Sequence, residues 1–186
     1  MRLDITTHRL FAPRLRRTLD AFAPRAADAT AEHFGRRPLA PVRIVLTSPL
    51  GLADQYVTTQ RQAAKIPADA PTVSRLLEWR PAKVRCITGL NPRQGQGTIT
   101  FLNGRRLRNT RDLEEAVLFE LAMVDQFLRR GAAERWVTYL RDLAGVDPLP
   151  RHHRARLNRD LDRSEQEAAQ AARSIRQRMT ARRAAA

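Results

Sequence analysis

A single glutamate lies inside the most apolar stretch of the chain. Residues 116–123 read Ala-Val-Leu-Phe-Glu-Leu-Ala-Met, and Glu120 is the only charged member. On a helix, the apolar side chains of this stretch and its flanks cover nearly all sides, which is typical of a buried helix. A carboxylate in such a place needs a cationic partner or a raised pKa. We therefore predict either an ion pair between Glu120 and an arginine, or a carboxyl group left over from chemistry.

The histidines, the cysteine and the glycines of the chain are not spaced as a metal, disulfide or phosphate-binding site requires. The four histidines have no metal-ligand spacing with a carboxylate or with the single cysteine; they are His8, His33, His152 and His153. Because Cys86 is the only cysteine, an internal disulfide and a multi-cysteine zinc site are excluded. Cys86 lies in a predicted strand, where it is expected to act as a small buried hydrophobe. The glycines of residues 89–97 do not connect a strand to a helix with phosphate-binding spacing, which argues against a P-loop or Rossmann site.

The helices and strands that must position Glu120 are predicted from the spacing of apolar residues and from residues that begin or end an element. Strands are predicted where β-branched residues alternate, at residues 42–47, 83–88 and 98–102. Helices are predicted from helical spacing, from capping residues and from proline or glycine stops. They cover residues 13–23, 24–34, 49–62, 73–79, 110–130 and 132–144. Asn109 or Thr110 is the expected N-cap of the helix that carries Glu120.

This order of elements predicts a mixed α+β fold. We expect a small mixed sheet that carries helices on one face, followed by a basic C-terminal tail that is helical or partly disordered. The predicted organisation is an N-terminal helical segment (1–37), an α+β core (38–150) and the tail (151–186). The only large apolar residues of the tail are too few to build a core; they are Leu157, Leu161, Ile175 and Met179.

The segment around Glu120 resembles the metal-binding helix of zincin metallopeptidases. A strand, an asparagine-containing turn, a polar loop and an acidic, N-capped helix precede Phe-Glu-Leu-Ala-Met-Val-Asp-Gln-Phe at residues 119–127. In zincins the matching stretch is His-Glu-x-x-His, in which two histidines bind zinc and the glutamate is the general base. Glu120 matches the general base, while Phe119 and Met123 stand at the two ligand positions.

The resemblance implies a zincin-like fold whose site is degenerate. Phenylalanine cannot bind a metal ion, and a thioether is a poor ligand for Zn²⁺. Zincins take a third ligand from a later helix, where Glu134 or Asp142 could stand. One carboxylate without two imidazoles does not form a catalytic site. The resemblance therefore implies a pseudo-peptidase with no metal and no cofactor, its cleft filled by Phe119 and Met123.

The charge of the chain favours anionic partners. The formal net charge is +15, and all basic residues except Lys65 and Lys83 are arginines. Nucleic acid or an acidic protein surface would suit this balance, although a merely solvated basic surface remains an alternative. The densest positive charge lies in the tail, where ten arginines face four acidic residues. The arginines expected to bind a polyanion or partner are Arg151, Arg154, Arg156, Arg159, Arg163, Arg173, Arg176, Arg178, Arg182 and Arg183.

Two classes of function follow from these observations. The first is a non-catalytic zincin-like domain that acts as a binding or structural scaffold, whose basic surface engages a polyanion or partner subunits in a homo- or hetero-oligomer. The second is a nucleic-acid-binding accessory protein of unrelated fold from a mobile element or phage. An active metallopeptidase ranks third.

No run of about 18 apolar residues is present, and the first residues lack the pattern of a signal peptide, so we expect no membrane partner and a cytoplasmic setting.

Overall fold

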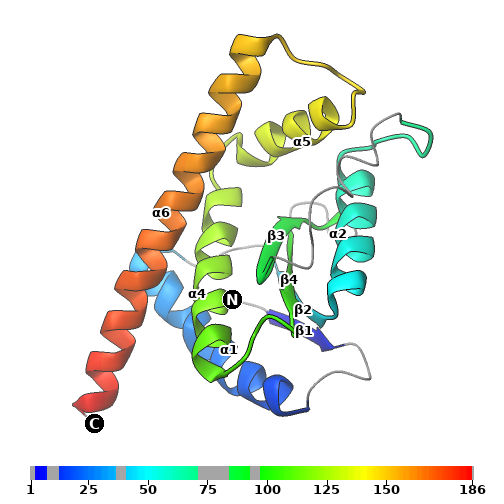
Figure 1. The fold of residues 1–186 in the computed structure, drawn as a ribbon. Coiled ribbons are helices and arrows are strands. Elements are labelled where there is room, and N and C mark those ends of the chain that lie inside the picture. The colour runs from blue at the N-terminus through cyan, green and yellow to red at the C-terminus, as the bar shows by residue number, and fades with distance from the viewer. Residues whose placement is uncertain (1–2, 8–12, 37–40, 71–83, 93–96, 186) are drawn as a thin grey trace.

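The structure is a computed structural model that describes residues 3–7, 13–36, 41–70, 84–92 and 97–185. It is an α+β fold that contains more helix than strand (Figure 1). In chain order the elements are β1 (Leu3–Thr7), α1 (Pro13–Phe34), β2 (Val42–Thr47), α2 (Pro49–Ala63), β3 (Cys86–Leu90), β4 (Thr98–Asn103), α4 (Thr110–Phe127), α5 (Ala132–Leu143) and α6 (Arg151–Ala184). The predicted helix at residues 73–79 lies outside the described residues.

The sheet is small and mixed, as predicted from the sequence. Its strand order is β1-β2-β4-β3; the first three strands are parallel, and β3 runs antiparallel to β4. The strand expected at residues 83–88 is shifted along the chain to Cys86–Leu90, with Ile87 opposite Phe101. β1 was not predicted. Residues 1–37, grouped above as a helical segment, thus also supply a strand that pairs with β2.

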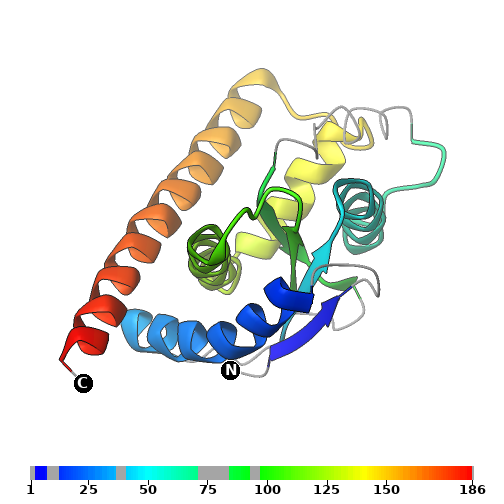
Figure 2. The same cartoon turned by 60° about the horizontal axis from the view of Figure 1, so that its bottom comes forward.

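Helices cover both faces of the sheet, which corrects the expectation that they cover one. On one face Ile44 and Leu46 of β2 and Leu102 of β4 pack with α1, α4 and α6. On the other face Val45 and Phe101 pack with α2 and α5. The two views show these layers (Figures 1 and 2). Burial on both faces explains why β2 is apolar at nearly every position instead of alternating cleanly.

The first helix continues through Pro24, so the predicted break at this residue is wrong. A proline inside a helix removes one backbone hydrogen bond and normally kinks or ends the helix. Here the cost is offset because residues on both sides of Pro24 are buried against α4 and the sheet, including Phe22, Ala23, Ala26 and Ala27. Tertiary packing therefore decides the length of this helix.

The C-terminal tail forms one long helix that packs on α4. Its buried residues are Leu157, Ala168, Ala171, Ala172 and Ile175. Ala168 and Ala171 form a small apolar cluster with Ala122 of α4, and Phe119 and Met123 pack against it. Figure 1 shows α6 running along α4 for most of its length. None of the described helices is long and apolar enough to cross a membrane.

Candidate binding cleft around Glu120

The helix that carries Glu120 begins where its own sequence predicts. Asn109 is the N-cap, and its side chain accepts a hydrogen bond from the backbone N–H of Asp112 at 2.8 Å. Asp112 adds negative charge in the first turn, where the helix dipole favours it. The helix ends at Phe127, three residues before the predicted end. Its apolar sides face α1, the sheet and α6, so Glu120 is carried into the interior.

Glu120 is 2 % exposed and has no cationic partner among the described residues. The predicted ion pair with an arginine is therefore wrong for the described part of the chain. Burial raises the pKa of the Glu120 carboxyl from 4.5 to about 7, although hydrogen bonds from Thr88 and Cys86 of β3 partly offset this effect. Within the described part of the chain, Oε2 of Glu120 has no hydrogen-bond partner. The structure thus keeps a buried carboxyl group that is close to half-protonated at neutral pH.

A short hydroxyl chain supports the Glu120 carboxyl from the sheet. Oγ1 of Thr88 lies 2.6 Å from Oγ1 of Thr100 on β4, and either hydroxyl can donate. When Thr88 donates to Glu120, Thr100 can therefore donate to Thr88. Cys86 is partly exposed as a residue, but its thiol is buried. This burial and the neighbouring Glu120 raise the pKa of the thiol well above its ordinary value. Cys86 is consequently a neutral thiol, as the sequence predicted for a small hydrophobe.

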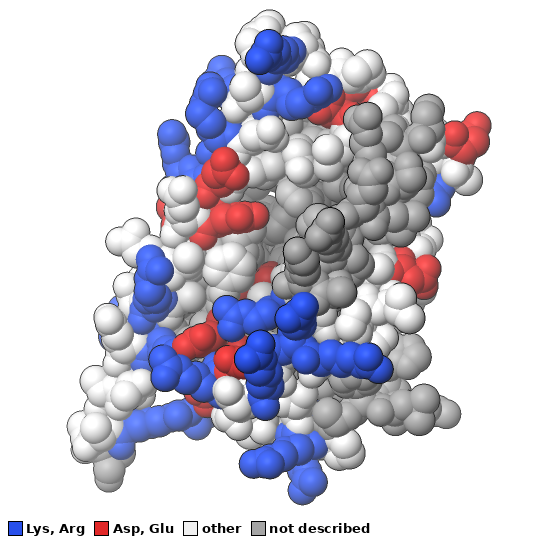
Figure 3. All heavy atoms as spheres, viewed as in Figure 1, with Lys and Arg blue, Asp and Glu red and all other residues white. Residues whose placement is uncertain are grey.

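A cleft of about 630 Å³ opens beside Glu120. It is formed by β3, α4, α5 and α6, and Phe119 and Met123 line it one helical turn apart. Its aromatic lining comprises Tyr56, Phe119, Phe127, Trp136 and Tyr139. Its charged lining comprises Glu120, Arg135, Asp160, Asp162 and Glu165. In Figure 3 the hollow between α4, α5 and α6 carries acidic side chains on its α6 side.

Gln60 of α2 fixes the wall of this cleft. Its fully buried amide donates to the carbonyl of Leu90 at 3.1 Å and accepts from the Leu90 N–H at 3.2 Å, as a neighbouring strand would. The same Oε1 accepts a hydrogen bond from Nε1 of Trp136 at 2.9 Å. Trp136 also makes an edge-to-face contact with Phe127. Gln60 thereby ties the end of β3 to Trp136 of α5, which lines the cleft.

The proposed third-ligand positions are not brought to the cleft. Glu134 is exposed on α5 and does not line it. Asp142 is buried and accepts two hydrogen bonds of 2.7 Å from Arg154, with a third from the Leu149 N–H. Arg154 lowers the pKa of the Asp142 carboxyl, so this residue is an ion-pair anchor between α5 and α6. No three described His, Cys, Asp or Glu side chains lie close enough to hold a metal ion.

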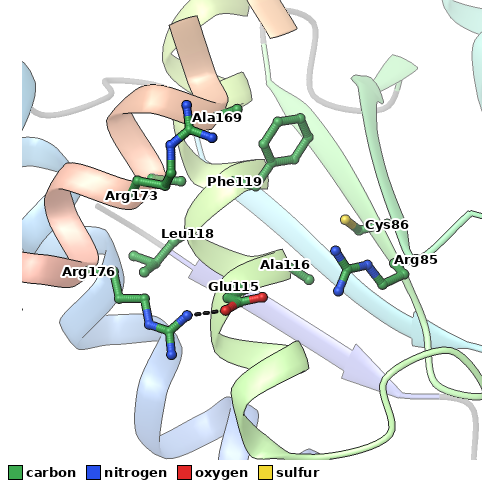
Figure 4. Close-up of a pocket in the computed structure, with 10 residues that line it drawn as sticks. Arg85, Cys86, Glu115, Ala116, Leu118, Phe119, Ala169, Arg173 and Arg176 are labelled. Atoms are coloured by element: carbon green, nitrogen blue, oxygen red, sulfur yellow. Dashed lines mark hydrogen bonds and ion pairs between the residues drawn. The ribbon is translucent and has the colours of Figure 1, made fainter. Parts of the chain in front are cut away.

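A second, basic pocket of about 420 Å³ lies on the other side of Phe119 (Figure 4). Arg85, Arg173 and Arg176 surround it, and its floor is formed by apolar residues of α4 and α6. Arg176 forms an ion pair with Glu115, which also accepts a hydrogen bond from Arg111 at 3.1 Å. Two of the three arginines are thus paired within the chain, because Arg85 also forms an ion pair with Asp112 at 3.8 Å.

The ten arginines of the tail fall into two groups. Five contact partners within the chain: Arg154 pairs with Asp142, Arg176 with Glu115, Arg182 with Glu32, Arg183 with Glu114, and Arg178 contacts His33. The other five form no ion pair with a described residue: Arg151, Arg156, Arg159, Arg163 and Arg173. At about 100° per residue these five occupy one arc of about 140°, opposite the buried face of α6. We call them the arginine stripe.

Sequence reasoning located Glu120, Phe119 and Met123 but missed most of the cleft. The missed residues are the acidic side chains of α6 and the aromatic side chains of α5. A signal for the α6 residues was present, because the acidic residues of the tail all lie within residues 160–167. Comparison of the chain with protein-family models, with curated proteins and with solved structures found no match.

Proposed function

We propose that this protein is a non-catalytic, zincin-like domain that acts as a binding or structural scaffold. One observation carries the proposal: the helix that holds Glu120 lies beneath the antiparallel strand β3 and borders an open cleft. Glu120, Phe119 and Met123 line this cleft together, which supports the proposal because the resemblance assigns them the positions of the general base and of the two histidines. A cytoplasmic setting and an interaction with a polyanion or partner subunits are parts of the same proposal.

The side chains that border Glu120 support binding rather than hydrolysis. Phe119 and Met123 offer apolar surface and no metal ligand of useful strength. The cleft volume lies within the range of small-molecule and peptide side-chain sites. Its walls are held by the Gln60 hydrogen bonds and by α6, so the space is formed before a ligand arrives.

Restoring the two histidines tests the zincin-like arrangement. We expect Phe119→His with Met123→His to bind Zn²⁺ at least tenfold more tightly than a matched pair at Gln177→His with Ala181→His, measured by competition with a chromogenic chelator. Both pairs have the same spacing, but only the first lies beside cleft carboxylates that can complete the coordination, since residues 168–186 contain no acidic residue. Adding Glu120→Gln should leave the affinity unchanged, because a general base is not a ligand. Equal affinity of the two histidine pairs would contradict the arrangement.

A polyanion-binding role is the second candidate, and the arginine stripe favours it. The stripe runs from Arg151 to Arg173, which is roughly 33 Å along the helix at 1.5 Å per residue. Only Asp162 interrupts its arc with negative charge. Guanidinium groups without intramolecular partners are free to bind phosphates, whereas Arg154 and Arg182 would first have to leave their carboxylates.

Neutralising the stripe tests this candidate. The variant Arg156→Gln, Arg159→Gln, Arg163→Gln is expected to bind duplex DNA or RNA at least tenfold more weakly at about 0.1 M salt. The slope of log K against log salt should fall by about 2 to 3 for duplex DNA. The control Arg14→Gln, Arg17→Gln, Arg25→Gln removes the same charge from exposed positions of α1. An equal loss in both variants would mean that overall charge, and not the stripe, governs binding.

A further inference from the structure

The cleft beside Glu120 contains two buried polar side chains that lack partners. Oε2 of Glu120 and both amide atoms of Gln126 make no hydrogen bond with a residue that the structure describes, although the two residues are only 2 % and 5 % exposed. Both line the same cleft. A buried polar group left unpaired costs about 1–3 kcal/mol, and native proteins leave few of them unsatisfied. Two such groups at one cleft indicate that a ligand or solvent completes the site.

The charge around the cleft selects the sign of that ligand. Glu120, Asp160, Asp162 and Glu165 line it, against one arginine, Arg135. Among the described residues no ion pair joins Arg135 to any of these acids. The net charge of the chain is strongly positive. At physiological salt, however, charges farther than about 8 Å are largely screened, so the local acids dominate.

The aromatic walls select the shape of the ligand. Trp136, Tyr139, Phe119 and Phe127 line the cleft, and Trp136 and Tyr139 have ring centroids 5.4 Å apart. A ring face attracts a cation placed within about 6 Å of its centroid. An apolar stem would lie against these rings while a charged head reached the Glu120 carboxylate.

We propose that this cleft binds an organic cation, an ammonium or guanidinium group on an apolar stem, with Glu120 as its counter-ion. Gln126 would accept a further hydrogen bond from the bound group. The proposal depends neither on a zincin-like ancestry nor on the arginine stripe, because it rests only on residues that line the cleft. The cation could be a free amine or the arginine side chain of a peptide, which present the same chemistry.

Titration calorimetry with benzylamine and with N-acetyl-arginine amide tests the proposal and distinguishes the two sources. We expect saturable binding of one or both at pH 8, at least tenfold weaker binding to Glu120→Gln, and unchanged binding to Glu134→Gln, which alters an exposed carboxylate outside the cleft. Benzyl alcohol, the neutral analogue of benzylamine, should bind at least tenfold more weakly. Absence of binding by both cations, equal binding of the alcohol, or equal binding to Glu120→Gln would each overturn the proposal.

The protonation of Glu120 gives a second measurement on the folded wild-type protein. The titratable groups that line the cleft with it are Cys86 on β3, Tyr56 on α2, Arg135 and Tyr139 on α5, and Asp160, Asp162 and Glu165 on α6. Arg135 is present in the free and the bound protein alike, so an added cation changes the local charge in one direction. A bound cation favours the ionised carboxylate. A saturating concentration of whichever cation binds in the calorimetry should therefore lower the NMR titration midpoint of Glu120 by at least one pH unit; an unchanged midpoint would overturn the proposal.

Discussion

The wild-type protein is expected to lose stability as the pH rises from about 4.5 to about 7, and the Glu120→Gln variant is expected not to show this loss. The folded state holds the Glu120 proton with a pKa of about 7, whereas an unfolded chain releases it near 4.5. Between these values the folded state binds more protons than the unfolded state, so stability falls as the pH rises. Below the lower value the stabilisation is fully present, and above pH 7 no further loss occurs.

The size of this effect follows from the pKa difference. One pKa unit corresponds to 1.36 kcal/mol, so the free energy of unfolding of the wild type should fall by about 2 to 3 kcal/mol relative to Glu120→Gln between pH 5 and pH 8. Urea denaturation of both proteins at each pH measures the difference. The comparison across pH cancels any constant cost of burying the glutamine amide. Glu134→Gln serves as the control, and a difference between wild type and Glu120→Gln that does not change with pH would contradict the assignment.

Local sequence signals were sufficient for the central helix and for the paired strands. Asn109 and Asp112 define the start of α4, and the apolar stripe of residues 113–128 defines its length. β2 and β4 follow from β-branched, apolar runs that are bounded by turn residues. In each case the signal lies within the segment itself. This is the condition under which propensity and periodicity predict well.

Other features depend on contacts between distant segments. β1 is five residues long and gains its partner only when β2 lies beside it. Pro24 stays inside α1 because the helix is held by packing on α4. The surroundings of Glu120 also depend on distant segments. The many arginines of the chain predicted an ion pair with Glu120, but the described arginines pair with Asp125, Asp142 and surface acids instead.

The acidic cleft was hidden by the composition of the tail. The charge count of residues 151–186 is dominated by arginine, and it predicts one basic surface. On the helix, Asp160 and Glu165 lie outside the arc of the arginine stripe and line the cleft with α4 and α5. Figure 3 shows both signs on the same face of the molecule. The position of each charge on α6 therefore predicts the acidic and basic surfaces better than the net charge does.

Removing the tail after Pro150 is expected to abolish the cooperative folding transition. The tail was expected to add little to the core because only large apolar residues were counted, yet three alanines of α6 are buried against α4. Leu157 and Ile175 are buried as well, and each is worth about 1.5–3 kcal/mol. Together with the buried alanines this loss is comparable with the whole stability of a typical domain, about 5–15 kcal/mol. Thermal unfolding followed by circular dichroism measures it.

A shorter truncation separates packing from charge. Removing residues 177–186 deletes Arg178, Arg182 and Arg183 but keeps every buried residue of α6. This variant should keep a cooperative transition with a modest decrease in melting temperature, because its lost ion pairs are largely exposed and solvent screens such pairs. A folded 1–150 fragment would show that α6 is an appendage. If the fragment unfolds, its failure to bind a polyanion says nothing about the arginines, and the stripe substitutions become the valid test of that interaction.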